Sequence, residues 1–216
     1  MSLKALIFDV DGTLADTERN GHRVAYNRAF EQLGIPWSWS ESTYGELLAV
    51  TGGKERMKYF VDNYQPEIPA DSVIDELIAG IYYTKTKIFK VRLLRGLIPL
   101  RCGVERLFIE ARAAGIRLAI ATSTAPSHVQ FLLTSTLGED SLGWFDIIAA
   151  GDIVENKKPS PEIYQLVLEE MGWKAEECVA FEDSENGCLS ARAADLPVII
   201  TVNAYTRDEA FKDATL

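Results

Sequence analysis

The sequence has no long apolar run and no cluster of basic residues. Its apolar segments are too short to span a bilayer, and the first residues lack the charged-then-apolar order of a signal peptide. The formal net charge of −10 argues against nucleic acid or an anionic membrane surface as a partner. A phosphorylated small molecule stays open, because a few local cations and a metal ion can dominate one site. We expect a cytoplasmic monomer.

Cysteine is also scarce. The three cysteines are odd in number and show neither a C-x-x-C motif nor the Cys/His spacing of a zinc site. We therefore expect free thiols, most of them buried. The chain of 216 residues is long enough to bury a full core, either as one domain with a sizeable insertion or as two modest domains.

Short apolar segments alternate with helical patterns through most of the chain. Strands are predicted at residues 6–8, 116–121, 145–149, 178–181 and 197–202. Helical patterns stand between them at 104–114, 161–171 and 189–194. This alternation predicts an α/β fold with a doubly wound parallel sheet. The chain stops soon after residues 205–207, and from this abrupt ending we expect a final edge strand to be short or absent.

The segment between residues 36 and 90 has little strand pattern. It contains amphipathic helical segments at 44–50, 54–64 and 72–89, which predict a small helical domain. The first strand needs neighbours to bury both of its faces, so it must belong to the later sheet. We therefore predict an α/β core domain from residues 1–15 and 91–216, with residues 16–90 inserted as a helical domain.

Polar residues follow four of the predicted strands. They are Asp9 and Asp11, Thr122 and Ser123, Lys157 and Lys158, and Glu182 and Asp183. The carboxyl ends of parallel strands share one edge, where open α/β sheets bind ligands. Carboxylates, hydroxyls and an ammonium group at that edge suit a divalent cation and a phosphoryl group. Each pattern alone has a simpler explanation, because such carboxylates and hydroxyls commonly serve turns and helix caps and a lysine pair usually lies on a solvated surface.

The order Asp9-Val10-Asp11-Gly12-Thr13, then Thr122, then Lys158-Pro159, then Glu182-Asp183 resembles the four motifs of haloacid dehalogenase-like (HAD) phosphatases. The helical insertion is similar to the cap domain of capped members. The resemblance implies that Asp9 attacks phosphorus and forms an aspartyl-phosphate. It implies that Asp11 protonates the leaving group and later takes a proton from water.

The same resemblance implies a magnesium site and a phosphate site. Mg²⁺ would be held by the Asp9 and Asp183 carboxylates and the backbone carbonyl of Asp11, with help from Glu182. Thr122 and the backbone amide of Ser123 would donate hydrogen bonds to the phosphoryl oxygens, while Lys158 would neutralise charge there and on Asp9. Lys158 is favoured over Lys157 because the family lysine directly precedes the proline.

A glycine pair marks the inserted domain, in Thr51-Gly52-Gly53-Lys54-Glu55-Arg56. It does not match the P-loop pattern, but as the start of a helix it would bind a second phosphate with Lys54 or Arg56. A solvated helix start is the alternative. Together with Tyr44 and Glu18, this stretch resembles the CbbY branch of the family, whose members resemble phosphatases of xylulose 1,5-bisphosphate. This resemblance implies that Glu18 contacts sugar hydroxyls. It implies that Tyr44, Lys54 and Arg56 contact the distal end of the substrate, away from the phosphate that is removed.

Several alternatives stay open from the sequence. A β-phosphoglucomutase uses the same machinery and returns the phosphoryl group to the substrate, and a phosphoglycolate phosphatase needs no grip on a distal phosphate. A catalytically silent module that binds a phosphorylated metabolite is a third. A serine hydrolase built on Ser123 or Ser127 with His128 lacks the G-x-S-x-G elbow. His22 stands one residue away from the position of a histidine in many capped relatives, so its role is open.

Overall fold

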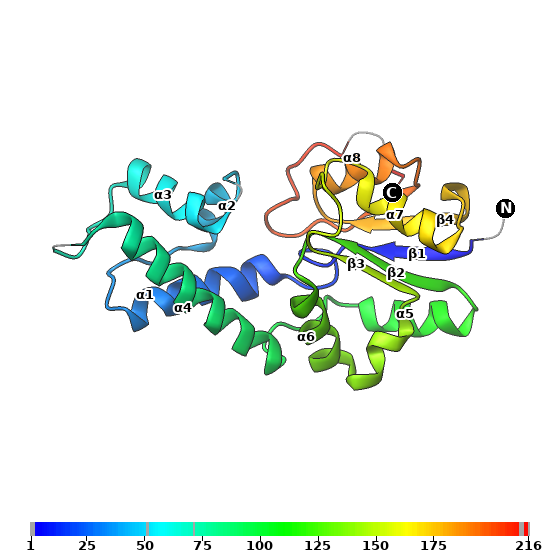
Figure 1. Cartoon of the computed structure of the whole chain (residues 1–216), viewed down its shortest axis with the longest axis horizontal. Coiled ribbons are helices and arrows are strands. Elements are labelled where there is room, and N and C mark those ends of the chain that lie inside the picture. Colours follow the sequence, from blue (N-terminus) through cyan, green and yellow to red (C-terminus); the bar gives the residue numbers. More distant parts are fainter. Residues whose placement is uncertain (1–2, 51, 71, 212–213, 216) are drawn as a thin grey trace. The chain divides into compact units, whose positions relative to one another are not determined.

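The chain forms two compact units (Figure 1). The computed structural model describes residues 3–50, 52–70, 72–211 and 214–215. The first unit, the α/β unit, contains the chain up to Thr17 and from Ile98 onward, and the second, the helical unit, spans Glu18–Leu97. The predicted boundary at residue 90 falls inside a helix that continues to Leu94. The assignment of the two units as core and cap domains stays a prediction.

The α/β unit is built on a five-stranded sheet with the order β3-β2-β1-β4-β5. The strands are β1 (Ala5–Phe8), β2 (Arg117–Thr122), β3 (Ile147–Ala150), β4 (Cys178–Glu182) and β5 (Val198–Ile200). Every neighbouring pair is parallel, which confirms the predicted sheet. β5 forms one edge with only three residues, and the amide of Thr215 donates to the carbonyl of Val198 at 2.9 Å.

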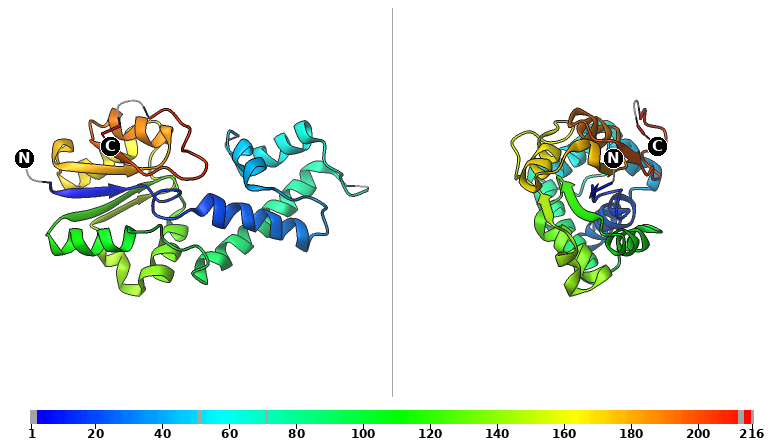
Figure 2. Two further views of the ribbon diagram at one scale, coloured as in Figure 1. Left: turned by 180° about the vertical axis from the view of Figure 1, so that it is seen from behind. Right: turned by 90° about the vertical axis from the view of Figure 1, so that its right-hand side faces the viewer.

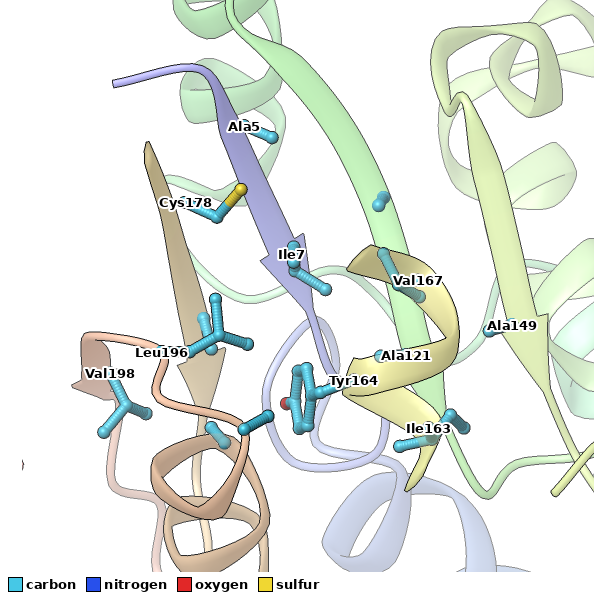
Figure 3. Packing of buried hydrophobic residues seen from close by; sticks show 14 of the residues in the cluster. Ala5, Ile7, Ala121, Ala149, Ile163, Tyr164, Val167, Cys178, Leu196 and Val198 are labelled. Atoms are coloured by element: carbon cyan, nitrogen blue, oxygen red, sulfur yellow. The ribbon is translucent and has the colours of Figure 1, made fainter. Parts of the chain in front are cut away.

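Helices cover both faces of this sheet (Figure 1). They are α5 (Val104–Ala113), α6 (Pro126–Leu137), α7 (Glu162–Met171) and α8 (Glu185–Ala193), with short 3-10 helices at η2 (Glu139–Trp144) and η3 (Ala175–Glu177). Successive strand residues point to opposite faces. Ile7 packs with Tyr164 and Val167 of α7 (Figure 3), whereas the Phe8 ring meets Phe108 of α5 with centroids 5.1 Å apart. The sheet is therefore doubly wound, as predicted.

In the described part of the helical unit there are four α-helices, and a π-helical turn, η1 (Thr17–His22), comes before them. The helices are α1 (Arg23–Gln32), α2 (Glu41–Leu47), α3 (Gly53–Tyr64) and α4 (Ile74–Leu94). α1 packs along α4 (Figure 2). An aromatic cluster fills the interior of the unit and contains Tyr26, Phe30, Trp37, Trp39, Tyr44 and Phe60. Trp39 is fully buried and lies at its centre.

Two further expectations meet the structure here. All three cysteines are free thiols, and Cys178 and Cys188 are buried while Cys102 is exposed. Among the residues that the structure describes, no helix combines the length and the apolar character needed to cross a membrane.

Replacing Trp39 with alanine tests the aromatic cluster. The ring has centroids of four neighbouring rings between 4.7 and 5.8 Å away, so its loss leaves a large cavity. We expect the free energy of unfolding to fall by about 3–5 kcal/mol, measured by urea denaturation. Tyr83→Ala is the control, because that side chain is 62% exposed, and it should change stability by less than about 0.5 kcal/mol. Equal effects of the two substitutions would contradict this packing.

Candidate active site

The predicted polar residues meet at the carboxyl edge of the sheet. Asp9 follows β1 directly, Thr122 ends β2 and Glu182 ends β4. The register aligns Phe8 of β1 with Phe181 of β4, so the residues that come next, Asp9 and Glu182, emerge side by side. The parallel sheet thus places two carboxylates at the same edge.

Lys158 joins these carboxylates. Its Nζ lies 2.7 Å from Asp9 Oδ1 and 2.6 Å from Glu182 Oε1, and it donates to the carbonyl oxygen of Ala121 at 2.9 Å. The side chain of Lys158 is 9% exposed. Lys157 instead forms an ion pair with Asp152 at the surface. Lys158 is therefore the lysine that the structure brings to the strand ends.

Three buried carboxylates form a candidate metal centre. Asp9, Glu182 and Asp183 each offer an oxygen atom, and these oxygens lie within 4.8 Å of one another. Burial raises the pKa of Asp9 to about 7, although Lys158 lowers it in part. Burial, with the nearby charges of Asp9 and Glu182, raises the pKa of Asp183 well above its usual value.

The lysine responds to the same charges. Burial alone would lower the pKa of Lys158, but the carboxylates of Asp9 and Glu182 outweigh burial and raise it. One ammonium group therefore faces three acidic groups in a site that water barely reaches. Clustered oxygen ligands with excess negative charge suit a hard divalent cation, so these residues fit the metal that the family resemblance implies.

Two backbone positions let the acidic groups come this close. Gly12 has φ +86°, and a Cβ atom there would lie 2.1 Å from Asp183 Oδ2. A Cβ atom on Gly187 would lie 1.9 Å from Glu182 Oε2. Any larger side chain at either glycine would displace a carboxylate of the cluster.

The remaining predicted residues of the α/β unit lie around this cluster. Asp11 accepts a short hydrogen bond from the hydroxyl of Thr124. Thr122 is buried, and its Oγ1 donates to Thr124 Oγ1 at 3.1 Å. Ser123 is exposed at the start of the loop after β2. The structure thus links Asp11 to Thr122 through one intermediate hydroxyl.

Within the helical unit, the structure joins three of the predicted residues by hydrogen bonds. Tyr44 OH donates to Glu18 Oε2 at 2.5 Å, and the Arg56 guanidinium donates to Tyr44 OH at 3.1 Å. Burial and the adjacent Glu18 raise the pKa of Tyr44. Arg56 also donates to the carbonyl of Leu47 at 3.1 Å, so part of its guanidinium fixes α2 to α3.

The glycine pair begins α3, as predicted. Gly52 has φ +93°, and the carbonyl of Gly53 accepts a hydrogen bond from Tyr26 OH at 3.2 Å. Lys54 is exposed, with its Nζ 5.5 Å from the centroid of the Tyr82 ring. Thr51, also predicted to bind substrate, lies outside the described residues. The ring of His22 stacks on Phe89 with centroids 3.8 Å apart.

Sequence reasoning missed three residues that contact the site. Tyr164 OH donates to Glu182 Oε1 at 2.5 Å, Thr124 donates to Asp11, and Asn203 Nδ2 donates to Asp183 Oδ2 at 2.6 Å. The rule that found the other residues also points to Asn203, since it follows β5. Tyr164 lies within α7 and Thr124 in a loop, so their contacts depend on how those segments pack.

The chain belongs to the haloacid dehalogenase-like hydrolase family, which matches residues 3–195. It is 45% identical to protein CbbY of Cereibacter sphaeroides over 98% of this chain and 90% of that protein. A phosphorylated carbohydrates phosphatase of Thermotoga maritima is 31% identical over 93% of this chain and 85% of that protein. The hydrolase family, together with the relative that is named a phosphatase, identifies the chain as a phosphatase.

Solved structures give the same result. The crystal structure of CbbY from Rhodobacter sphaeroides in complex with phosphate has a TM-score of 0.80 and 44% identity, covering 99% of this chain and 92% of that chain. A mutant of that protein in complex with xylulose-(1,5)bisphosphate matches equally well. The predicted HAD-like fold of the CbbY branch is confirmed.

Replacing Asp9 with asparagine tests the buried charge. Because burial raises the pKa of folded Asp9 from 3.8 to about 7, the folded state holds the proton that the unfolded state loses between these values. Stability of the metal-free protein therefore falls as pH rises through this range. We expect Asp9→Asn to be more stable than the parent at pH 7 by on the order of 1 kcal/mol or more.

The measurement is urea denaturation in EDTA at several pH values. The difference in free energy of unfolding between Asp9→Asn and the parent should shrink as the pH falls toward 3.8, because below that value Asp9 is mostly protonated in both the folded and the unfolded state. Added Mg²⁺ should reduce this stability difference between the variant and the parent at neutral pH, because a bound cation stabilises the ionised carboxylates of the parent. A stability difference between the two proteins that does not change with pH would show that the charge of Asp9 is not what destabilises the site.

Proposed function

We propose that the chain is a Mg²⁺-dependent phosphatase that hydrolyses a sugar bisphosphate through an aspartyl-phosphate, and that xylulose 1,5-bisphosphate is its substrate. The observation that carries this proposal is the pair of acids with different surroundings. Asp9 is buried against Lys158, and Asp11 is half-buried and bonded to a neutral hydroxyl. Two acids in different environments suit two different roles.

Asp9 is the proposed nucleophile. One of its carboxylate oxygens attacks phosphorus as the bond from phosphorus to the ester oxygen breaks, and Asp11 gives its proton to the leaving oxygen. In the second half, Asp11 takes a proton from water, which attacks phosphorus and releases phosphate and free Asp9. Lys158 holds Asp9 in place by its 2.7 Å contact. Thr122 and the amide of Ser123 are the proposed donors to the phosphoryl oxygens.

The proposed magnesium ligands are the carboxylates of Asp9 and Asp183 and the backbone carbonyl of Asp11. When bound, the cation offsets the repulsion between an anionic nucleophile and an anionic phosphate. Glu182 accepts hydrogen bonds from both Lys158 and Tyr164 on its Oε1. We therefore assign Glu182 the role of holding Lys158 beside Asp9, in addition to adding negative charge to the centre.

The helical unit is the proposed source of substrate choice. The chain of hydrogen bonds Arg56–Tyr44–Glu18 offers a cation, a hydroxyl and a carboxylate. In this proposal Glu18 contacts sugar hydroxyls, while Arg56, Lys54 and the backbone amides at Gly52 and Gly53 bind the phosphate that is not removed. The relative that is solved with xylulose-(1,5)bisphosphate supports this choice of substrate.

A phosphate-release assay tests the reaction. With Mg²⁺, xylulose 1,5-bisphosphate should release one equivalent of phosphate, and EDTA should abolish the release because the acidic cluster then lacks its cation. Asp11→Asn should lower kcat by about 10² to 10⁴ through loss of the proton carrier, while ligand binding measured by calorimetry is retained.

Other outcomes point to other functions. Formation of glucose 6-phosphate from β-glucose 1-phosphate, with no phosphate released from the bisphosphate, would identify a mutase. Turnover of phosphoglycolate alone would identify a phosphoglycolate phosphatase. Binding of bisphosphates without any metal-dependent turnover would identify a binding module and contradict the proposal.

Replacing Lys54 and Arg56 together with alanine tests the proposed binding of the phosphate that is not removed. We expect kcat/KM for the bisphosphate to fall about tenfold or more, because charge-assisted bonds to the second phosphate are lost. Turnover of a sugar monophosphate should change much less. Lys58→Ala is the matched control, since Lys58 is an exposed lysine of the same helix. An equal loss for both substrates would contradict a distal phosphate site.

A further inference from the structure

The segment after β5 reaches the acidic cluster through Asn203. Its Nδ2 donates to Asp183 Oδ2 at 2.6 Å, and its Oδ1 accepts a hydrogen bond from the backbone amide of Tyr205 at 2.8 Å. The two partners fix the orientation of the carboxamide, because an acceptor faces its nitrogen and a donor faces its oxygen. The backbone amide of Asn203 also donates to Thr206 Oγ1 at 3.1 Å. Asn203 is thus held in one turn and points one donor at Asp183.

Both oxygens of Asp183 are engaged. Thr13 Oγ1 donates to Oδ1 at 3.3 Å while Asn203 donates to Oδ2. Thr13 belongs to the loop after β1, whereas Asn203 belongs to the segment after β5. A carboxylate held from two sides cannot rotate freely about its own side-chain bonds, so its oxygens keep a fixed direction toward the cluster.

Arg101 connects the two loops that carry these donors. Its guanidinium donates to the carbonyl of Gly12, to the carbonyl of Thr201 at 2.6 Å and to the carbonyl of Val202 at 2.7 Å. Its backbone amide donates to the carbonyl of Leu14 at 2.8 Å. Arg101 therefore fixes the segment after β5 to the loop after β1, directly beside Asn203.

We propose that Asn203 is a positioning residue that orients the Asp183 carboxylate for the divalent cation, and that Arg101 holds Asn203 in place. This inference rests on the proposed function, in which Asp183 binds Mg²⁺. Hydrogen bonds to a ligating carboxylate orient it, and their loss typically costs 10–100-fold in metal affinity or activity. Asn203 acts through Asp183 and is not itself assigned a contact with the substrate.

The test is calorimetric titration of the full chain with Mg²⁺ in the absence of substrate. Asn203→Leu keeps the size of the side chain and removes the donor. We expect it to bind Mg²⁺ about 10–100-fold more weakly, with kcat largely restored at saturating Mg²⁺. Ala204→Ser is the matched control, because Ala204 is the exposed neighbour in the same turn, and it should bind Mg²⁺ as the parent does.

A second variant covers the case in which the leucine variant does not fold. Asn203→Ser keeps an oxygen that can accept the Tyr205 amide bond but is too short to reach Asp183, so it should also weaken Mg²⁺ binding. Arg101→Gln should weaken binding in the same direction. The double variant with Asn203→Leu should lose less than the product of the single losses, since both act through Asp183.

The outcomes separate this inference from the proposed function. A parent chain that binds no Mg²⁺ would overturn the proposed metal dependence, and this inference with it. A parent that binds Mg²⁺ together with Asn203 variants that bind it equally well would overturn only the role of Asn203. Loss of kcat that saturating Mg²⁺ does not restore, with unchanged Mg²⁺ affinity, would also overturn that role.

Discussion

The site depends on one buried ammonium group, that of Lys158. The parallel register of β1 and β4 sets Asp9 beside Glu182, and adjacent like charges on neighbouring strands destabilise a sheet. Lys158 lies between them, within 2.7 Å of each carboxylate. Removing the lysine would leave two buried carboxylates without their cation, and breaking a buried ion pair in this way costs about 3–5 kcal/mol. The lysine therefore stabilises the adjacent ends of β1 and β4 as well as forming part of the site.

The position of Lys158 depends in turn on packing behind the sheet. The lysine precedes α7, whose Tyr164 and Val167 are fully buried against β1 and its neighbours (Figure 3). Tyr164 connects the hydrophobic core to the polar site, because its ring packs in the core and its hydroxyl donates to Glu182. The hydrophobic core thus fixes the polar site. In the proposed function, the excess negative charge of that site serves to bind the cation.

The sequence predicted those parts of the fold and of the site that a local sequence pattern determines. The alternation of short apolar segments with helical patterns predicted the parallel sheet, and the position directly after a predicted strand pointed to Asp9, Glu182 and Asp183. Lys158 lies several residues beyond β3, and the family resemblance singled it out over Lys157. Tyr164 and Thr124 were missed because their contacts depend on how α7 and the loop after β2 pack. Asn203 was missed although it follows a predicted strand, as the other site residues do. The end of α4 was also misjudged, since the helix continues beyond residue 90 to bury Leu93. The roles assigned to Glu18, Tyr44 and Arg56 came from family resemblance, and only the structure joins the three by hydrogen bonds.

The two units differ in what each can discriminate. In the proposed function, the groups at the strand ends bind a metal ion and the phosphoryl group. Every phosphate ester has a phosphoryl group, so these groups carry little information about the rest of a substrate. The helical unit presents a different surface, with a carboxylate, a phenol and a guanidinium joined in series. Its aromatic cluster supports that series, because Tyr44 and Tyr26 pack against Trp39. Tyr26 also holds the start of α3 by its bond to Gly53. Selection among phosphorylated sugars is therefore expected to depend on the helical unit, and changes there should alter substrate choice while leaving the chemistry at Asp9 intact.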